Sequence, residues 1–494
     1  MADYLHGAYG RINTAGNRAA SKSNSAFVYI GTAPVHLVSN GAGNVNKPVL
    51  VSNIAEAKAL FGYSDDFAKY TLCEAMKAHL IDNGVSPIVL INVLDPAVHI
   101  SEQGGSVSLT ANNGRVIIPD AESICVDTLS VKSGSESKTY GVDYTVAYND
   151  SKKTLTIAEL KSGALGTSTL TITWTAVDAT KVDKTTVIGT TDNYGKNTGI
   201  YAVKDVYQLT GYVPSYILAP GFSSIPAVHS VMRGIAQKIN GHWDAYVIAD
   251  LPIVDESGEK ITIASAKTWK NANGYNGDNE TVYFPMATGA DGKHYHLSVL
   301  SAANLQTLLT AQDGIPYKSA SNTEIAVRSL YMGEEAEGTV FDDQIINENL
   351  CKNGIASAAF VGGKWVIWGA HTASYTYESG DSITVAETNT MMMYYLSNDF
   401  QNRRAANVDK PMTANDLKSI VSEEQARLDA LIKIGALTYG TVMLEASAAP
   451  ESDIMNGDFT FSFNITTTPL AKSLTAVVTW TNDGFITYYE AMYA

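Results

Sequence analysis

Two glycine-containing loops are the first candidates for chemistry, because loops of this kind can hold phosphate groups. The segment GTTDNYGKN from Gly189 resembles a phosphate-binding loop, but five residues rather than four separate its glycines. Asn197 also stands where that loop supplies a hydroxyl ligand for magnesium. Gly41 and Gly43 could open a dinucleotide-binding turn, but its third glycine is missing, because position 46 is asparagine. We interpret both loops as ordinary turns and predict no cofactor.

A second candidate is a pair of histidines. His294 and His296 are two residues apart, so on a strand both would face the same way, with Asp291 near enough to be a further metal ligand. No third histidine or cysteine stands close to them in the sequence. We therefore predict no metal site.

Paired carboxylates could serve as general acid and base. The pairs are Glu334 with Glu335, Asp342 with Asp343, and Glu423 with Glu424. Charged residues are mostly solvated at protein surfaces, which is the simpler interpretation of all three pairs. The sequence also contains no glycine-bracketed nucleophilic serine and no HExxH motif. These observations predict that the protein is not an enzyme.

Composition restricts the partners. The chain has 494 residues, of which 45% are apolar and 17% charged, so it should fold as about three units. The 50 acidic residues outnumber the 34 basic ones, for a net charge of −16. Nucleic acid and anionic membranes are therefore disfavoured as partners, because their negative charge would repel the chain.

The expected compartment is reducing. Cys73, Cys125 and Cys351 are odd in number and far apart, which fits neither a disulfide framework nor a zinc site. Residues 1–25 lack the apolar core of a secretory signal, and the apolar run from Ile88 to Leu94 is too short to cross a bilayer. We expect a soluble protein that is made in the cytoplasm.

The first segment with regular structure is predicted over residues 26–103. AFVYIGTAP, from Ala26, and PIVLINVL, from Pro87, are typical of buried strands. Between them, Asn53 is a predicted N-cap with Glu56 three residues later, and Gly62 is a predicted stop. A second helical pattern covers about residues 66–82. The segment is therefore predicted to be a βααβ unit.

Two further domains are predicted in the middle of the chain. Residues 104–197 are rich in Ser, Thr and Val in short alternating runs, which predicts an inserted all-β domain. Helical and strand patterns alternate again over 198–354, which predicts a second, middle α/β domain.

The C-terminal third contains the clearest helix, from Asn415 to Ile434, within a segment that spans 355–472. Residues 473–494 are predicted to be a β arm, because Asn482-Asp483-Gly484 stands between the strand-like runs SLTAVVTWT and FITYY.

The two ends of the chain favour assembly. Between Phe459 and Tyr489 only Lys472 and Asp483 are charged, and a strand edge with so few charges invites pairing with another chain. Alternatively, this segment lies inside its own sheet. The N-terminal arm, residues 1–25, offers a short extended run, AYGRI, of the kind that is donated across a subunit boundary. The predicted exchange residues are Ala8, Tyr9, Gly10, Arg11 and Ile12 at one end and Phe485, Ile486, Thr487, Tyr488 and Tyr489 at the other.

An ordered series of segments resembles the contractile tail sheath proteins of bacteriophages and related injection machines. The series begins with GAYGRI, AFVYIGTAP and PVLVSNIAEAKALFG, and continues with YILAPGFSS, VYFP and GIPYKSASN. NGIASAAFVGGKWVIWGAHT resembles the most recognisable stretch of that family, although His371 stands where the family usually has arginine. The resemblance covers about 400 residues and leaves out the β insertion.

The resemblance implies an inner α/β domain made of the N-terminal and C-terminal segments (26–103 and 355–472), with the middle domain, the β insertion and extended terminal arms outside it. It implies a homo-oligomer of stacked hexameric rings around a tail tube, together with baseplate and tail terminator proteins. The particle would be a virion tail or tail-like particle, assembled in the host cytoplasm, that penetrates the host cell envelope. A phage-tail-like bacteriocin and, in a different class, a β-rich surface adhesin are the alternatives. Candidates to face the tube are Arg403, Arg404, Lys418, Arg427 and Lys433.

Overall fold

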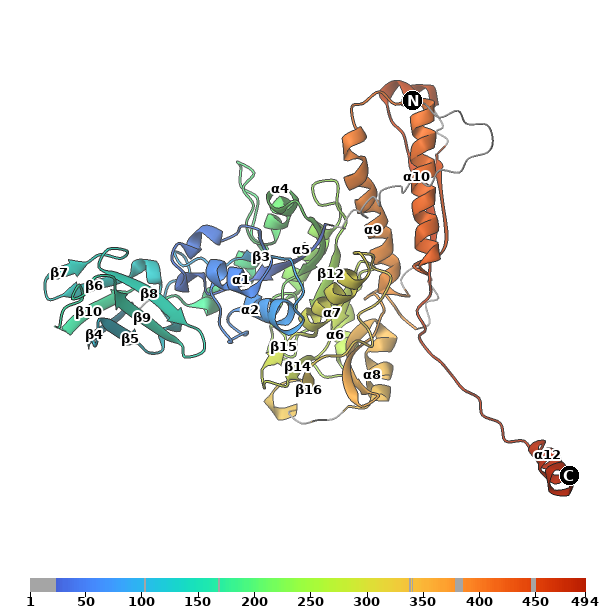
Figure 1. The fold of residues 1–494 in the computed structure, drawn as a ribbon, viewed down its shortest axis with the longest axis horizontal. Coiled ribbons are helices and arrows are strands. Elements are labelled where there is room, and N and C mark those ends of the chain that lie inside the picture. Colours follow the sequence, from blue (N-terminus) through green and yellow to red (C-terminus); the bar gives the residue numbers. More distant parts are fainter. Residues whose placement is uncertain are drawn as a thin grey trace, which may run out of the picture. The chain divides into compact units, whose positions relative to one another are not determined.

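The computed structural model describes residues 24–101, 104–167, 169–336, 339, 341–377, 385–445 and 450–494. It has a mixed α/β architecture with several sheets (Figure 1). The chain divides into two compact units, residues 1–414 and 415–494. The predicted exchange residues Ala8 to Ile12 lie outside the described part of the chain.

The centre of the first unit is an eight-stranded sheet. Its strands are β1 (Ser25–Gly31), β2 (Val49–Val51), β3 (Ile88–Asn92), β11 (Val213–Leu218), β12 (Tyr246–Asp250), β13 (Glu280–Tyr283), β17 (Ile355–Val361) and β18 (Lys364–Trp368). They lie in the order β18-β17-β13-β12-β11-β1-β3-β2. The six inner strands are parallel, and the edge strands β18 and β2 are antiparallel to their neighbours. Every residue of β3 and β12 is buried, as expected for parallel strands covered on both faces.

Helices of the first unit pack on this sheet in two groups. The helices are α1 (Ile54–Phe61), α2 (Thr71–Met76), α3 (Lys184–Ile188), α4 (Val206–Thr210), α5 (Pro226–Ala236), α6 (Ala266–Ala272), α7 (Leu297–Ala311), α8 (Asp343–Asn349) and α9 (Glu387–Arg404). In one group α5 packs against α3, and in the other α2 packs against α7. The predicted cap of α1 is confirmed, because Asn53 Oδ1 accepts a hydrogen bond from the Glu56 N–H at 2.9 Å.

The strand order corrects the prediction of separate inner and middle α/β domains. Strand β1, from the first segment, lies between β3 and β11, and β11 belongs to the middle segment. Strand β17, from the C-terminal third, pairs with β13 in the same sheet. The two predicted domains therefore share one sheet and one core. Alternating helical and strand patterns predict the elements but not which strands pair. The β insertion between the two segments was therefore interpreted as a boundary between two domains.

The inserted segment forms two antiparallel sheets around a hydrophobic cluster of its own, which includes Val116, Leu155 and Ile172. The sheet orders are β4-β10-β6-β7 and β5-β9-β8. Val182 and Val187, near the predicted end of the insertion, are buried in the main core instead. The strands are β4 (Gly105–Thr110), β5 (Arg115–Ile118), β6 (Ser130–Ser133), β7 (Glu136–Lys138), β8 (Tyr144–Asn149), β9 (Thr154–Glu159) and β10 (Thr169–Trp174). A further small sheet of the first unit contains β14 (Met286–Gly289), β15 (His294–Tyr295) and β16 (Val327–Tyr331).

The second unit is a long helix against a β-hairpin. Its elements are α10 (Ala414–Lys433), β19 (Leu437–Leu444), α11 (Pro450–Asn456), β20 (Phe461–Thr467) and α12 (Gly484–Tyr493). Strands β19 and β20 are antiparallel and form a two-stranded sheet, called the hairpin below. Leu428 of α10 packs against Gly440, where a Cβ would lie only 3.1 Å from the Leu428 Cβ, so glycine permits this close approach.

The C-terminal hairpin predicted around Asn482-Asp483-Gly484 is wrong for this structure. Residues 468–483 contain no helix or strand, and Gly484–Tyr493 is α12. Phe485, Tyr488, Tyr489 and Met492 recur at the spacing of one helical face, a pattern that the local Asp-Gly turn signal concealed. None of the described helices is both long enough and apolar enough to cross a membrane.

Candidate assembly surface

The structure separates the residues considered for metal binding. His294 stacks on Tyr331, with ring centroids 3.6 Å apart. His296 binds Glu74 instead, and Asp291 accepts a hydrogen bond from the Tyr295 hydroxyl at 2.8 Å. Among the described residues there is no group of three His, Cys, Asp or Glu side chains that could hold a metal ion.

The glycine loops and the carboxylate pairs have structural roles. Gly189 ends α3 rather than opening a helix, and Asn197 accepts a hydrogen bond from the Thr191 hydroxyl within the same loop at 2.6 Å. Asp342 caps α8 by accepting from the Ile345 N–H at 2.8 Å, and Glu335 pairs with Lys260. Glu424, expected at the surface, is instead fully buried.

A buried charge cluster, which no local sequence pattern predicts, joins α2 to the start of α7. His296 Nδ1 lies 2.7 Å from Glu74 Oε2, and the Glu74 side chain is completely buried. Ser298 donates its backbone N–H to Asp250 at 3.1 Å, beside the same histidine. Burial alone would lower the pKa of His296, but the charge of Glu74 and its hydrogen bond raise it to about 9. The histidine is therefore a cation that fixes two elements of the core.

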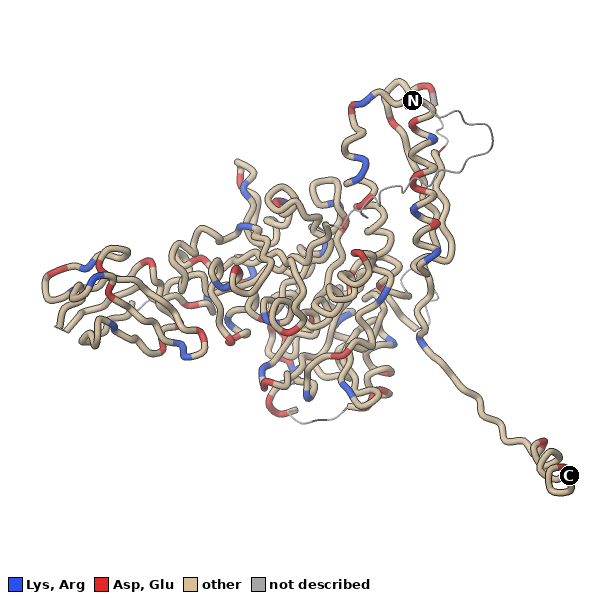
Figure 2. The backbone as a smooth tube through the Cα atoms, in the orientation of Figure 1, with Lys and Arg blue, Asp and Glu red and all other residues tan. Residues whose placement is uncertain are grey.

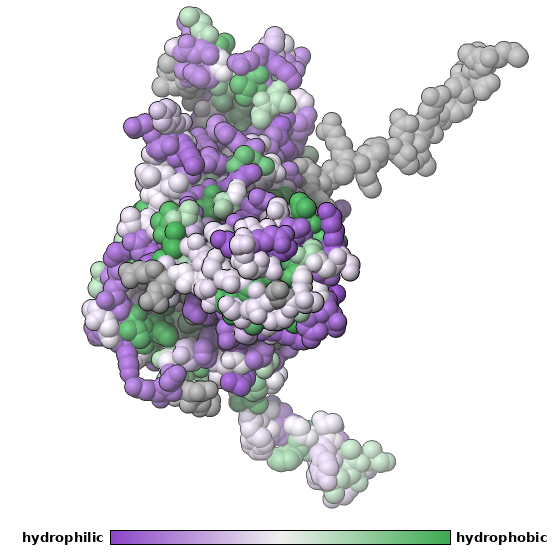
Figure 3. All heavy atoms as spheres, turned by 90° about the vertical axis from the view of Figure 1, so that its left-hand side faces the viewer, coloured by the Kyte–Doolittle hydropathy of each residue, from purple (hydrophilic) through white to green (hydrophobic). Residues whose placement is uncertain are grey.

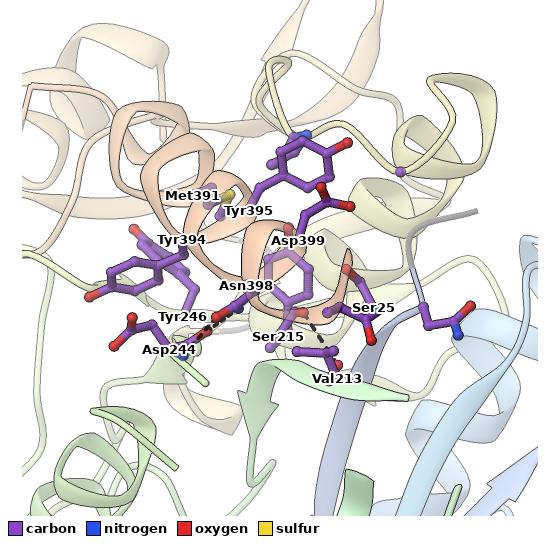
Figure 4. A pocket seen from close by; sticks show the side chains of 15 residues that line it. Ser25, Val213, Ser215, Asp244, Tyr246, Met391, Tyr394, Tyr395, Asn398 and Asp399 are labelled. Carbon is purple, nitrogen blue, oxygen red and sulfur yellow. Dashed lines mark hydrogen bonds between the residues drawn. The ribbon is translucent and has the colours of Figure 1, made fainter. Parts of the chain in front are cut away.

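A pocket lies between the first described residues, the strands β11 and β12, and helix α9 (Figure 4). Asn398 of α9 accepts from the Asp244 N–H at 3.0 Å and donates to the Asp244 carbonyl at 2.8 Å. Burial raises the pKa of Tyr394, in the pocket wall, to about 12, so this phenol stays protonated. These contacts attach α9 to the sheet, and we interpret the pocket as a packing feature.

The most conspicuous surface of the second unit is residues 468–494, called the C-terminal tail. Leu474 and Val478 are each 91% exposed, and Trp480 is 76% exposed. The only charged side chains of the tail are Lys472, Asp483 and Glu490, and its final helix presents apolar side chains to solvent (Figures 2 and 3). Exposed apolar surface of this kind marks a site of contact with another molecule.

The predicted C-terminal exchange residues lie in this tail, on α12 rather than on a strand. Phe485, Ile486, Tyr488 and Tyr489 are each between 64% and 67% exposed. Their exposure suits a role in contact, but the conformation differs from the predicted strand.

The five cations predicted to face a tube lie on two helices, α9 in the first unit and α10 in the second. Arg403 and Arg404 end α9 in the first unit, and Arg403 pairs with Asp399. At 100° per residue, Lys418 and Lys433 lie 60° apart on the exposed side of α10, whereas Arg427 lies opposite Lys418 and is half-buried.

One side chain that sequence reasoning missed closes an edge of the hairpin. Gln425 of α10 donates from Nε2 to the Gly440 carbonyl at 3.0 Å, and its Oε1 accepts from the Val442 N–H at 3.1 Å. Residues alternate in an antiparallel strand, so these two backbone groups point away from β20. Asp429 accepts a second hydrogen bond from Gln425 Nε2 at 2.9 Å and holds the amide in place.

Replacing Gln425 with alanine should therefore open this edge. We expect the Val442 amide to lose protection against hydrogen exchange. The free energy of local opening should fall by about 1–2 kcal/mol, because two hydrogen bonds are lost. Hydrogen exchange of peptides that cover residues 437–444 would measure it. The control is S422A, on an exposed residue whose hydroxyl bonds only to Lys418 O of its own helix. Equal exchange in both variants would show that Gln425 does not close the edge.

Comparison with known proteins gives relatives over the full length of the chain, although no family model matches. The tail sheath protein of Burkholderia phage BcepMu is 26% identical over 518 aligned residues, which cover 98% of each chain. The major tail sheath protein of Serratia phage KSP20 is 24% identical, over 64% of this chain and 75% of the relative.

Solved structures share the fold. A chain of the anti-feeding prophage baseplate matches with a TM-score of 0.55 and 12% identity, over 97% of this chain and all of that one. A chain of the PVC extracellular contractile injection system, in its contracted sheath complex, matches with a TM-score of 0.55 and 10% identity over 98% of both chains. The chain is thus similar to a phage tail sheath protein over 98% of both chains and shares its fold with chains of contractile injection systems, in agreement with the resemblance to contractile tail sheath proteins.

Proposed function

We propose that this chain is the sheath subunit that polymerises as stacked hexameric rings around a tail tube. The observation that carries the proposal is the match to a phage sheath protein over 98% of both chains. The exposed apolar tail supports it, because such a segment suits contact with a neighbouring subunit. Its partners would be further copies of the chain, the tube, the baseplate and the tail terminator, and assembly would take place in the host cytoplasm.

Contraction would follow from a second packing of the same subunits. The lattice would be trapped in an extended form until the baseplate releases it, and the subunits would then rotate as rigid bodies into a shorter lattice. Two packings of one chain can differ by only a few kcal/mol, but the difference is summed over many subunits. That sum would drive the tube through a bacterial envelope.

A phage tail is favoured over a bacteriocin or another injection machine, because both sequence relatives described above are phage proteins. A surface adhesin would share the Thr-rich β-strands, but sheath similarity along the whole chain favours the tail.

Electron microscopy of the purified full-length chain tests the proposal. We expect hollow polymers with six-fold symmetry in end views. When the tail tube protein of the same particle is added, we expect polymerisation around the tubes. A chain that stays monomeric at every concentration and does not bind the tubes would overturn the proposed function.

The exposed lysines of α10 provide a test of the tube contact. If this side of the helix meets the tube, K418E combined with K433E should weaken assembly on tubes, measured by co-sedimentation, and leave the monomer folded. R427E is the matched control, because Arg427 projects from the opposite side of the helix to Lys418. An exposed ion pair contributes only about 0–1 kcal/mol, so the effect should also weaken with salt. Unchanged co-sedimentation of the double variant would exclude this contact.

A further inference from the structure

The chain contains eight Asn-Gly pairs, all within the described residues. Asparagine is chemically labile, because the backbone nitrogen of the next residue can attack its side-chain carbonyl carbon and close a five-membered imide ring. Glycine as the next residue adds no side chain that would hinder this attack. Two of the pairs, Asn273-Gly274 and Asn276-Gly277, stand three residues apart in the loop between α6 and β13. Their surroundings in the fold differ.

At Asn276-Gly277 a buried carboxylate accepts the glycine N–H. The Gly277 N–H donates to Glu280 Oε1 at 2.6 Å, and the Glu280 side chain is completely buried. The other carboxylate oxygen, Oε2, contacts His229 Nε2 and lies 3.5 Å from Arg233 Nε. The carboxylate is thus held from both sides, with one oxygen directed at the Gly277 nitrogen. This is the contact that a general base makes before it takes a proton.

A buried cation contacts the side-chain carbonyl of the same asparagine. Lys270, in α6, is only 1% exposed, and its Nζ donates to Asn276 Oδ1 at 3.0 Å and to the Ala373 carbonyl at 2.6 Å. Burial lowers the pKa of Lys270 to about 8, so the ammonium form still predominates at neutral pH. A positive charge at Oδ1 stabilises the negative charge that develops on this oxygen when a nucleophile attacks Cγ.

Packing fixes the glycine and leaves the asparagine accessible. A Cβ at position 277 would lie 2.7 Å from Arg233 Nε, so a side chain there would displace this guanidinium. The Gly277 carbonyl accepts a hydrogen bond from the Ser374 N–H at 2.9 Å. Asn276 itself is exposed, so water can reach its side chain and ammonia can leave. The loop therefore combines a fixed nucleophile with an open path for the leaving group.

We propose that Asn276 and Gly277 form a self-modifying site, in which Glu280 is the general base and Lys270 polarises the reacting carbonyl. The Gly277 nitrogen forms a bond to Asn276 Cγ while its proton passes to Glu280 Oε1. The bond between Cγ and Nδ2 then breaks, and the amide group leaves as ammonia with that proton. Water opens the resulting cyclic imide at either carbonyl, which gives aspartate or isoaspartate. No atom is oxidised or reduced, and the reaction does not depend on the proposed polymer.

Peptide mapping of the full-length protein, aged at neutral pH, tests the site. After denaturation, trypsin cuts behind Lys270 and Lys293, so one peptide, 271–293, contains both Asn273-Gly274 and Asn276-Gly277. Fragmentation of this peptide measures conversion at each asparagine separately. The imide appears as the loss of one ammonia, and its hydrolysis products appear as aspartate and isoaspartate.

Asn273 is the internal control. Its side-chain amide donates to the Trp269 carbonyl at 2.9 Å, and among the hydrogen bonds of the described residues no carboxylate accepts from the Gly274 N–H. In the folded protein we expect Asn276 to convert at least about 10-fold faster than Asn273, because only Asn276 has a positioned base. In the denatured chain the two rates should become similar, because both asparagines are followed by glycine and the fold no longer distinguishes them.

Two variants separate the roles of the base and the cation. E280Q should lower the Asn276 rate towards that of Asn273, because an amide cannot take the proton. K270M should also slow the reaction, since it removes the charge at Oδ1. K267M is the matched control, because Lys267 lies on the same helix but is exposed. Circular dichroism checks that each variant is folded.

Equal rates at Asn273 and Asn276 in the folded wild-type protein would overturn the inference, as would an Asn276 rate that rises on denaturation. Folded E280Q with the wild-type rate would exclude Glu280 as the base. A stable link between Lys270 and Asn276, seen as loss of ammonia together with failed cleavage at Lys270, would show that the lysine amine attacks instead and would also overturn it. If E280Q does not fold, the comparison of folded and denatured wild-type protein decides.

Discussion

A chain that ends at Lys472 is expected to fold normally but to need at least about 100-fold more protein to polymerise, which corresponds to about 2.8 kcal/mol for each subunit contact. Residues 473–494 are exposed throughout, so the rest of the chain loses few contacts when they are removed. In the polymer the same truncation would remove the exposed apolar side chains that suit contact with a neighbouring subunit. Sedimentation against protein concentration measures the effect, and circular dichroism checks the fold. Polymers at the wild-type concentration would contradict a role of the tail in contact between subunits.

Two point variants distinguish contact through one side of the segment 473–481 from a general apolar contact. V478D places a charge on the apolar side of the segment, whereas T479D places it on the other side, one residue away. We expect V478D to approach the effect of the truncation and T479D to polymerise nearly normally, because only the first charge would be buried without a partner. Equal effects would show that the segment does not bind through one side.

The second large effect is expected from the buried pair in the first unit. H296Q should lower the free energy of unfolding by about 3–5 kcal/mol at neutral pH, because it leaves the Glu74 carboxylate without its cation. Glu74 is fully buried, and a buried carboxylate that has lost its partner is costly. Denaturant unfolding of the full chain, monitored by hydrogen exchange of peptides from α2 and α7, measures the loss of free energy. The control is H294Q, at an exposed histidine two residues earlier.

The same pair gives the stability a defined pH dependence. The pKa of His296 is about 9 in the folded chain, above its ordinary value of 6.5, so its stabilising contribution is complete below pH 6.5 and is lost as the pH rises through 9. The difference between wild type and H296Q should therefore shrink by about 3 kcal/mol between pH 6 and pH 10. A difference that stays constant over this range would mean that His296 is neutral in the core.

Local elements could be predicted where the signal lies within a few residues. The cap at Asn53 needs only a side-chain oxygen and a glutamate three residues later, and both are visible in the sequence. The buried strand β3 and the long helix α10 follow from apolar runs and apolar spacing in the same way. The resemblance to contractile tail sheath proteins came from the order of several weak segments.

Contacts between distant residues could not be predicted. Strand β1 lies between β3 and β11 in the sheet. The β insertion separates β3 from β11 in the sequence, and no local pattern indicates that both strands belong to one sheet. Glu74 and His296 are 222 residues apart. Gln425 resembles any polar residue on a helix surface until the hairpin is folded beside it. In the tail, aromatic residues favoured strands at 485–489, whereas the structure has a helix there and no helix or strand at 473–481.

The position of β1 has a mechanical consequence. Strand β1 begins at Ser25 and is a central strand that is bonded to β11 on one side and β3 on the other. Tension applied at its N-terminal end would act along this strand, so the ladders on both sides would be sheared together. An edge strand pulled sideways would instead open one bond at a time. The N-terminal end of β1 should thus be among the last parts of the fold to yield to a pulling force.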